Sequence, residues 1–175
     1  MKKRILFFGM LMLFQATQML FSQTKGFYEN VQKKNINKVL DDLNEFAAKA
    51  DFQNYFSLYA DESTFIGTDA TEIWNKKELM AYAKPYFDKG KAWNFTSLKR
   101  NIYFSPDGKF AWFDEILDTQ MKLCRGSGVL ERTGNQWKIK QYVLSVTVPN
   151  EVVDEVVKVK TPIEEVFFQK LKAEN

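Results

Sequence analysis

Carboxylates, tyrosines and lysines are the groups in this chain that could perform acid–base chemistry, because its 175 residues include no histidine. Histidine is the commonest metal ligand and a frequent general base, so a Ser-His-Asp triad, a Cys-His pair and a histidine zinc site are all excluded. The single cysteine, Cys124, cannot form an internal disulfide and is expected to pack as a small apolar residue. The sequence predicts no metal site and no cofactor.

Acidic and aromatic residues gather between Asp51 and Trp74, where a short helix leads through an acidic turn into a strand. Asp69, Glu72 and Trp74 follow the strand and are expected at the mouth of a pocket between a helix and a curved sheet. Asp69 is a candidate acid–base group and ligand contact, and Tyr59 and Trp74 are candidates for an apolar lining. The alternatives are solvent-exposed helix-start charges for Glu72 and core packing for the aromatic residues.

The first 23 residues have the features of an export signal. Three basic residues at positions 2–4 precede an apolar run over residues 5–14, which is too short to span a bilayer as a helix. Cleavage is expected near Ser22 or Gln23, and an uncleaved membrane anchor is the alternative. We therefore expect a periplasmic or secreted protein without stable membrane insertion.

Removal of that leader leaves about 150 residues, enough for one domain with a substantial core. Of the 25 basic residues, the three in the leader are lost, so 22 basic residues face 22 acidic ones. A nucleic-acid-binding protein would normally keep a clustered positive surplus. Nucleic-acid binding is therefore not expected.

The first half of the mature chain reads as helices with one strand. Apolar residues follow a helical rhythm over residues 36–49, and Asp51 is a plausible N-cap for a second, short helix. Residues 64–68 read as a strand. Asn75 is expected to cap a third helix, which Pro85 should end.

The second half reads as a long antiparallel meander. Alternating segments are predicted over residues 93–105, 110–121, 123–132 and 137–148, with a hairpin turn at residues 106–108. Two glycines in the third segment would permit a bulge or a strong curl. Helices followed by an antiparallel sheet indicate the α+β class.

Residues 24–35 are expected to form an N-terminal extension, residues 36–149 the domain, and residues 150–175 an amphipathic tail. Thr161 and Pro162 look like the N-cap and first position of a helix in that tail. The helix is expected to pack on its own domain or on a second subunit.

The order of these elements resembles the nuclear transport factor 2-like superfamily, and its SnoaL-like branch in particular. The resemblance covers about residues 35–148 and is carried by the helix-to-strand junction at residues 58–67 and the late Trp-Lys-Ile at 137–139. It implies a nuclear transport factor 2-like, cystatin-like cone, in which a curved antiparallel sheet wraps around the N-terminal helices. It also implies one deep cavity and, often, a homodimer.

If function resides in that cavity, the inward-facing side chains are the site. Strand alternation places Phe113 and Glu115 on one face and Trp112 and Asp114 on the other, and we expect the first pair to face inward. Glu115 is then the leading candidate for a catalytic carboxylate. A bulge that shifts the register would make Asp114 the inward carboxylate instead. For Trp112 we favour a core position.

Arg125 is expected to meet Glu115 across neighbouring strands, where it could bind an anion or hold Glu115 as a base. A purely structural ion pair is the alternative. Arg100 is expected to face the cavity or to pair with an acid outside the sheet.

On the last strand, alternation groups Gln141 and Ser145 with Trp137, which is itself expected in the core. Gln141 and Ser145 are therefore candidate ligand contacts. The resemblance often places a histidine where Val143 stands here, so the acid–base mechanism of such relatives does not carry over.

Three functions remain open after the sequence alone. One is a module that binds a small hydrophobic or anionic molecule, and another is a cofactor-free isomerase, lyase or hydrolase. A third is a dimerising association domain.

Overall fold

The computed structural model describes residue 26 and residues 28–174 of the chain. The predicted leader lies outside these residues. The helices after the first are α2 (Phe52–Ser57), α3 (Lys76–Asp88), the short 3₁₀ helix η1 (Asn150–Val152) and α4 (Val153–Ala173). The strands are β1 (Tyr59–Ile66), β2 (Ile73–Asn75), β3 (Thr96–Phe104), β4 (Phe110–Thr119), β5 (Lys122–Thr133) and β6 (Gln136–Val146).

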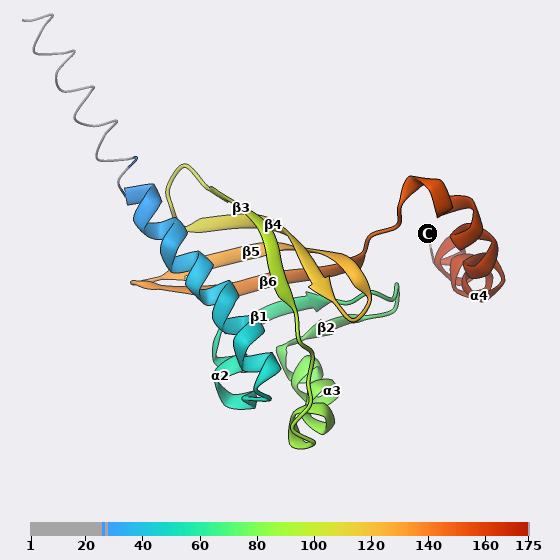
Figure 1. Ribbon diagram of the computed structural model, residues 1–175, viewed down its shortest axis with the longest axis horizontal. Helices are drawn as coiled ribbons and strands as arrows, with labels where there is room; N and C mark the ends of the chain where they lie inside the picture. The colour runs from blue at the N-terminus through green and yellow to red at the C-terminus, as the bar shows by residue number, and fades with distance from the viewer. Residues whose placement is uncertain (1–25, 27, 175) are drawn as a thin grey trace, which may run out of the picture.

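One six-stranded sheet, in the order β2-β1-β6-β5-β4-β3, forms the body of the molecule. The N-terminal helix, residues 28–48, crosses the sheet, α2 and α3 lie at one end, and α4 stands apart (Figure 1). The fold is the predicted α+β arrangement of a curved sheet and helices. The sheet is not wholly antiparallel, however, because β1 pairs with β6 in parallel.

The N-terminal helix is longer than its apolar rhythm predicted. Its buried face includes Ile36, Leu40, Leu43 and Ala47, as expected. The helix also extends back to residue 28, and the buried Gln32 accepts a hydrogen bond from Trp137 Nε1 at 2.9 Å. A hydrogen bond to β6 thus positions the first turns of the N-terminal helix. The apolar periodicity of the sequence does not reveal such a polar contact.

Side-chain caps begin the next two helices where the sequence placed them. The Asp51 carboxylate accepts the backbone N–H of Asn54 at the start of α2. At the start of α3, Asn75 and Glu78 form a reciprocal capping box. Pro85 does not end α3, which continues to Asp88 and thereby buries Phe87 in the core.

Two irregular strand pairings change which residues face inward. Lys140 is an extra residue in β6, since Val129 lies opposite Gln141 whereas Leu130 lies opposite Ile139. One extra residue reverses the alternation beyond it. Trp137 and Ile139 are therefore followed inward by Tyr142 and Leu144, and not by the predicted Gln141 and Ser145. A similar shift in β3 falls between Ser97 and Lys99.

The outer face of the sheet carries exposed aromatic residues. Trp112 is 46% exposed and stacks on Tyr103 with ring centroids 5.9 Å apart. The predicted core position of Trp112 is therefore wrong, whereas Trp137 and Cys124 are buried as expected. Trp112 follows the outward alternation of β4, and a cross-strand partner shields one face of its ring.

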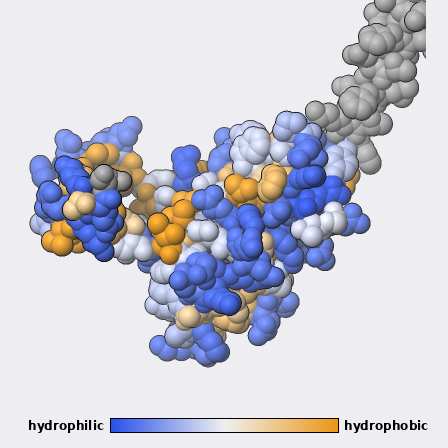
Figure 2. Space-filling view, turned by 180° about the vertical axis from the view of Figure 1, so that it is seen from behind, coloured by the Kyte–Doolittle hydropathy of each residue, from blue (hydrophilic) through white to orange (hydrophobic). Residues whose placement is uncertain are grey.

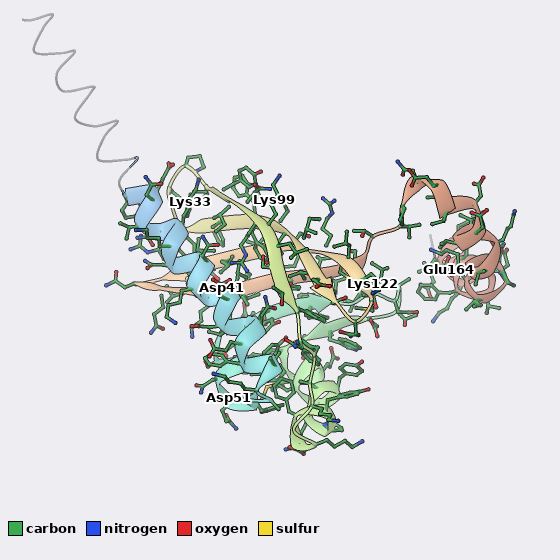
Figure 3. The ribbon with its side chains drawn as sticks, in the orientation of Figure 1. Lys33, Asp41, Asp51, Lys99, Lys122 and Glu164 are labelled. Atoms are coloured by element: carbon green, nitrogen blue, oxygen red, sulfur yellow. The ribbon has the colours of Figure 1, made fainter. Side chains whose placement is uncertain are left out.

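The C-terminal helix α4 begins at Val153, nine residues before the predicted first position at Pro162. Thr161 does not cap it, because its hydroxyl donates to the carbonyl of Val157 within the helix. No residue of α4 is buried. Its side chains, Glu164 among them, radiate from the helix at a distance from the sheet (Figure 3).

Candidate functional site

A cavity of about 190 Å³ lies between the inner face of the sheet and the helices. We call it the aromatic cavity, because eight aromatic side chains line it: Tyr55, Tyr59, Phe65, Trp74, Tyr82, Trp93, Phe95 and Tyr142. The remaining lining residues are Leu43, Asn44, Gly67, Thr68, Glu72, Leu79, Gln120, Met121 and Leu144. Small-molecule sites commonly have such walls, with a few polar groups that orient the ligand.

The hydroxyl groups of Tyr55 in α2 and Tyr59 at the start of β1 lie next to each other. Tyr55 Oη and Tyr59 Oη lie 3.1 Å apart, and the Trp93 ring packs edge-on against Tyr55 with ring centroids 5.5 Å apart. Both residues are buried, and burial raises the pKa of each phenol above its ordinary value. The pair therefore stays neutral at physiological pH and can offer the cavity a hydroxyl group.

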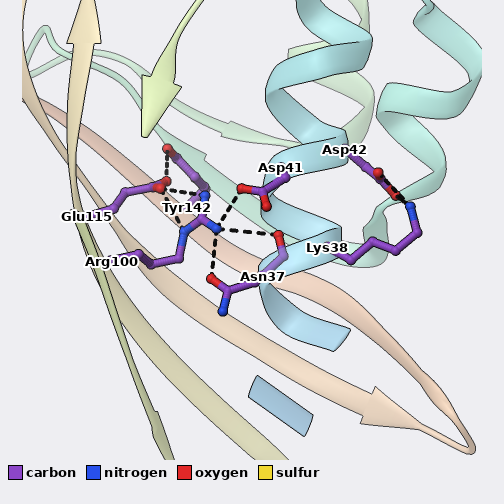
Figure 4. A network of polar contacts seen from close by, with 7 residues as sticks. All are labelled: Asn37, Lys38, Asp41, Asp42, Arg100, Glu115 and Tyr142. Carbon is purple, nitrogen blue, oxygen red and sulfur yellow. Dashed lines mark hydrogen bonds and ion pairs between the residues drawn. The ribbon is translucent and has the colours of Figure 1, made fainter. Parts of the chain in front are cut away.

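Tyr142 connects the cavity to a buried ion pair (Figure 4). Its hydroxyl donates to Glu115 Oε1 at 3.1 Å, and Glu115 Oε2 accepts Arg100 Nε at 2.9 Å. Arg100 Nη2 lies 2.8 Å from the same oxygen, and the Glu115 side chain is 1% exposed. Burial, followed by the Glu115 charge, raises the pKa of Tyr142 well above the ordinary value.

The other end of Arg100 is anchored to the N-terminal helix. Its Nη1 donates to Asn37 Oδ1 at 3.0 Å and to Asp41 Oδ1 at 2.8 Å. Neither Arg100 nor Glu115 lines the aromatic cavity. We call Arg100, Glu115, Tyr142, Asn37 and Asp41 the buried ion-pair network.

Two glycines of β5 let side chains from β4 and β6 touch across the strand between them. A Cβ on Gly126 would lie 2.5 Å from Tyr142 Oη and 2.9 Å from Glu115 Cγ. A Cβ on Gly128 would lie 2.9 Å from Phe113 Cε1, and the Phe113 and Tyr142 rings are 5.7 Å apart. The glycines, predicted to give curl, thus also make room for the network.

Glu72 lies at the mouth of the aromatic cavity and is the one charged side chain among the described residues that line it. The carboxylate packs over Gly67, where an added Cβ would lie 2.2 Å from Glu72 Oε2. The same oxygen accepts the backbone N–H of Asp69 at 3.2 Å. A turn and a missing side chain therefore hold the half-buried carboxylate in place.

Of the residues predicted to bind a ligand, Tyr59 and Trp74 line the cavity. Phe113 and Glu115 face inward and are buried as predicted, but they do not line it. Asp69 belongs to the turn at the mouth, where hydrogen bonds from Thr71 lower the pKa of its carboxyl group.

Arg125 does not meet Glu115. A tight turn between β4 and β5 places Gly126 opposite Glu115 and Arg125 opposite Ile116. Residues directly opposite share a face, so Arg125 lies on the outer face and is exposed. Asp114 also points outward, where it accepts a hydrogen bond from Asn101 Nδ2 at 3.0 Å.

Sequence reasoning missed Tyr142 and assigned the wrong partner to Glu115. The hairpin at residues 106–108 was recognised, and its register places Arg100 directly opposite Glu115. That register was a usable signal for the ion pair. Tyr142 could be found only by locating the extra residue at Lys140, for which the sequence gives no sign.

The described residues offer neither a metal site nor a membrane-spanning helix. Among residue 26 and residues 28–174, no three acidic or cysteine side chains are grouped so as to hold a metal ion. Across the same part of the chain, no helix combines the length and apolar character needed to span a bilayer.

The chain is similar to known proteins both in sequence pattern and in fold. The profile of the SnoaL-like domain matches residues 36–149, and no curated protein matches the chain. Among solved structures, an NTF2-like protein of unknown function from Pseudomonas putida KT2440 is similar, with TM-score 0.58 and 14% identity over 70% of this chain and 92% of that one.

Two further structures share the fold. A putative dehydratase of the NTF2-like family from Streptomyces avermitilis has TM-score 0.60 and 13% identity, covering 69% of this chain and 99% of that one. The association domain of C. elegans CaMKII has TM-score 0.55 and 17% identity, covering 67% and 98%. At such identities the similarity concerns the fold alone.

Proposed function

Because the chain belongs to the SnoaL-like domain family, we propose that it binds a small, largely apolar molecule in the aromatic cavity. The observation that carries the proposal is the concentration of eight aromatic side chains around about 190 Å³ of space. Pockets for drug-sized ligands have volumes of about 300–1,000 Å³, so a ligand of this smaller cavity would itself be smaller than a drug-sized molecule.

Mass spectrometry of small molecules that co-purify with the natively produced protein tests this proposal. Thr68 is exposed at the mouth, so Thr68→Trp should block the cavity without disturbing the core. The neighbouring Ala70 is exposed but does not line the cavity, and Ala70→Trp is the matched control. A compound retained by the wild type and the control but lost from Thr68→Trp supports the proposal. Equal retention by all three argues against it.

A cofactor-free lyase, isomerase or hydrolase is the second candidate. It is favoured by the neutral tyrosine hydroxyls at the cavity and by the name of the similar putative dehydratase. Glu115 is enclosed behind Tyr142, so a tyrosine would be the group that meets a substrate. NMR of the co-purified compound incubated with the protein separates the candidates, because a binding module returns it unchanged.

We also propose that two copies associate through α4. Val156, Val159, Ile163 and Val166 recur at spacings of three and four, as in a coiled-coil seam, and Ile163 is 75% exposed. Hydrophobic surface covers much of this helix (Figure 2). In a parallel pair, Glu155 of one copy lies opposite Lys160 of the other, so the flanking charges attract.

Sedimentation velocity tests the association. Ile163→Glu should convert dimer to monomer, since it places a charge in the seam. Thr161→Glu adds the same charge on the opposite side of α4 and should leave the dimer intact. A monomeric wild type, or equal effects of the two variants, would refute pairing through this seam.

Export remains part of the proposal, supported by the basic and apolar pattern of the first 23 residues. N-terminal sequencing of protein recovered outside the cytoplasm should give a chain that begins near residue 23 or 24. An intact N-terminus would contradict cleavage.

A further inference from the structure

We infer that the aromatic cavity selects a small organic amine, bound as its ammonium ion beside Glu72, over neutral and anionic molecules of the same shape. The inference rests on the proposed function and names the ligand class of that site. It departs from the expectation of an anionic ligand, which depended on an inward-facing Arg125.

The first argument is charge. Glu72 is the one charged side chain among the described residues that line the cavity. The Arg100 side chain is 7% exposed and already contacts Glu115, Asn37 and Asp41. An anion that entered the cavity would meet a carboxylate and no partner cation, whereas a cation would meet an opposite charge.

The second argument is hydrogen-bond direction. A carboxylate accepts and cannot donate, and Glu72 retains acceptor capacity after taking the N–H of Asp69. Tyr142 has a single hydroxyl proton, which it donates to Glu115. The oxygen of Tyr142 can therefore only accept from a ligand. Two of the polar groups at the cavity thus require a donor, and an ammonium group has three.

The third argument is the aromatic lining. Trp74 belongs to an aromatic wall in which it stacks on Phe65 and on Tyr82, with ring centroids 6.1 and 4.5 Å apart. Aromatic rings close to a carboxylate attract ammonium groups through the negative potential of their faces. The cavity would hold about six waters, at about 30 Å³ each, which matches one ring with a short amine arm.

Titration calorimetry with three probes of matched shape tests the inference: phenethylamine, 2-phenylethanol and phenylacetate at pH 7. For the wild type we expect phenethylamine to bind about tenfold more tightly than 2-phenylethanol, with phenylacetate weakest. In Glu72→Gln, phenethylamine and 2-phenylethanol should bind with similar affinity. The amine loses the opposite charge of the carboxylate, whereas the affinity of the alcohol does not depend on that charge. Glu62→Gln removes an exposed carboxylate outside the cavity and should retain the tenfold preference.

Gly67→Ala provides a second variant that keeps the charge but moves it. Its Cβ would displace the Glu72 carboxylate, so the preference for the amine should fall as it does in Glu72→Gln. If 2-phenylethanol binds the wild type as tightly as phenethylamine, the inference is wrong while the proposed function stands. If none of the three binds, the inference is also wrong, and the co-purification experiment decides the proposed function separately.

Discussion

Glu115 and Glu72 are two carboxylates on the cavity side of one sheet, and their surroundings differ in almost every respect. Glu115 is enclosed in β4, with an arginine on one oxygen and a phenol on the other. Glu72 lies at the mouth, half-buried, and is held by one backbone N–H. A neutralised, enclosed carboxylate serves the fold, whereas one that faces an aromatic cavity without a cation is free to serve a ligand.

The largest expected effect comes from removing the cation that pairs with the enclosed Glu115. Arg100→Met leaves Glu115 charged and without its cation, which should lower the free energy of unfolding by about 3–5 kcal/mol. Urea denaturation measures the loss. Lys99→Met, which changes the exposed neighbour, should have an effect below about 0.5 kcal/mol.

The double variant Arg100→Met, Glu115→Leu completes that experiment. It removes both charges, so most of the lost stability should return. A double variant as unstable as Arg100→Met alone would show that the loss comes from packing and not from the uncompensated charge.

Tyr142→Phe should have a smaller effect on stability. It removes the hydrogen bond to Glu115 while the ring contacts with Phe65 and Phe113 remain. Loss of a hydrogen bond to a charged group should cost about 1.5–3 kcal/mol in urea denaturation. A cost below about 0.5 kcal/mol would mean that Tyr142 does not support the enclosed carboxylate.

The stability of the protein at alkaline pH depends on the raised pKa values of its buried phenols. Burial raises the pKa of Tyr55, Tyr59 and Tyr142 above the ordinary value of 10.0, so the folded state holds these protons more tightly than the unfolded state. Their contribution to stability is complete below pH 10 and is lost as the pH rises above it. Each should cost about 1.4 kcal/mol per pH unit.

Tyr55→Phe should therefore reduce the fall in unfolding free energy between pH 10 and pH 11 by about 1 kcal/mol, the contribution of one such phenol. Urea denaturation of the variant and the wild type at pH 9, 10 and 11 measures this difference. Identical slopes for the two proteins would show that Tyr55 titrates normally in the folded state.

The smallest effect on stability is expected for Glu72→Gln. The side chain is partly exposed and has no cationic partner among the residues described, so unfolding should change by less than about 0.5 kcal/mol. A loss comparable with that of Arg100→Met would abolish the distinction between the two carboxylates.

The sequence alone predicted the α+β class and the caps at Asp51 and Asn75, because these depend on local patterns. It also placed Phe113 and Glu115 on the inner face, since β4 alternates without interruption. The errors fall where one residue changes the register. Gln141 and Ser145 were assigned inward because an ordinary lysine, Lys140, gives no sign that it is an extra residue.

The cross-strand partner of a residue was harder to predict than the face of the sheet on which its side chain lies. Arg125 was chosen as the partner of Glu115 because it lies on the next strand, but the turn after β4 places it one position out of register. Arg100, on the preceding strand, is opposite Glu115 once the hairpin is counted. The cavity itself is lined from six helices and strands, and no local pattern encodes how these come together.

Because position 126 is a glycine, the addition of one methyl group there could change the hydrogen-bonding character of the cavity wall. In Gly126→Ala the new carbon would separate the phenol of Tyr142 from the Glu115 carboxylate without altering either residue. The released hydroxyl could then turn its hydrogen toward the cavity, and a wall that accepts hydrogen bonds from a ligand would become one that donates them. A preference for basic guests could give way to one for carbonyl compounds through a change in a residue that need not touch the ligand.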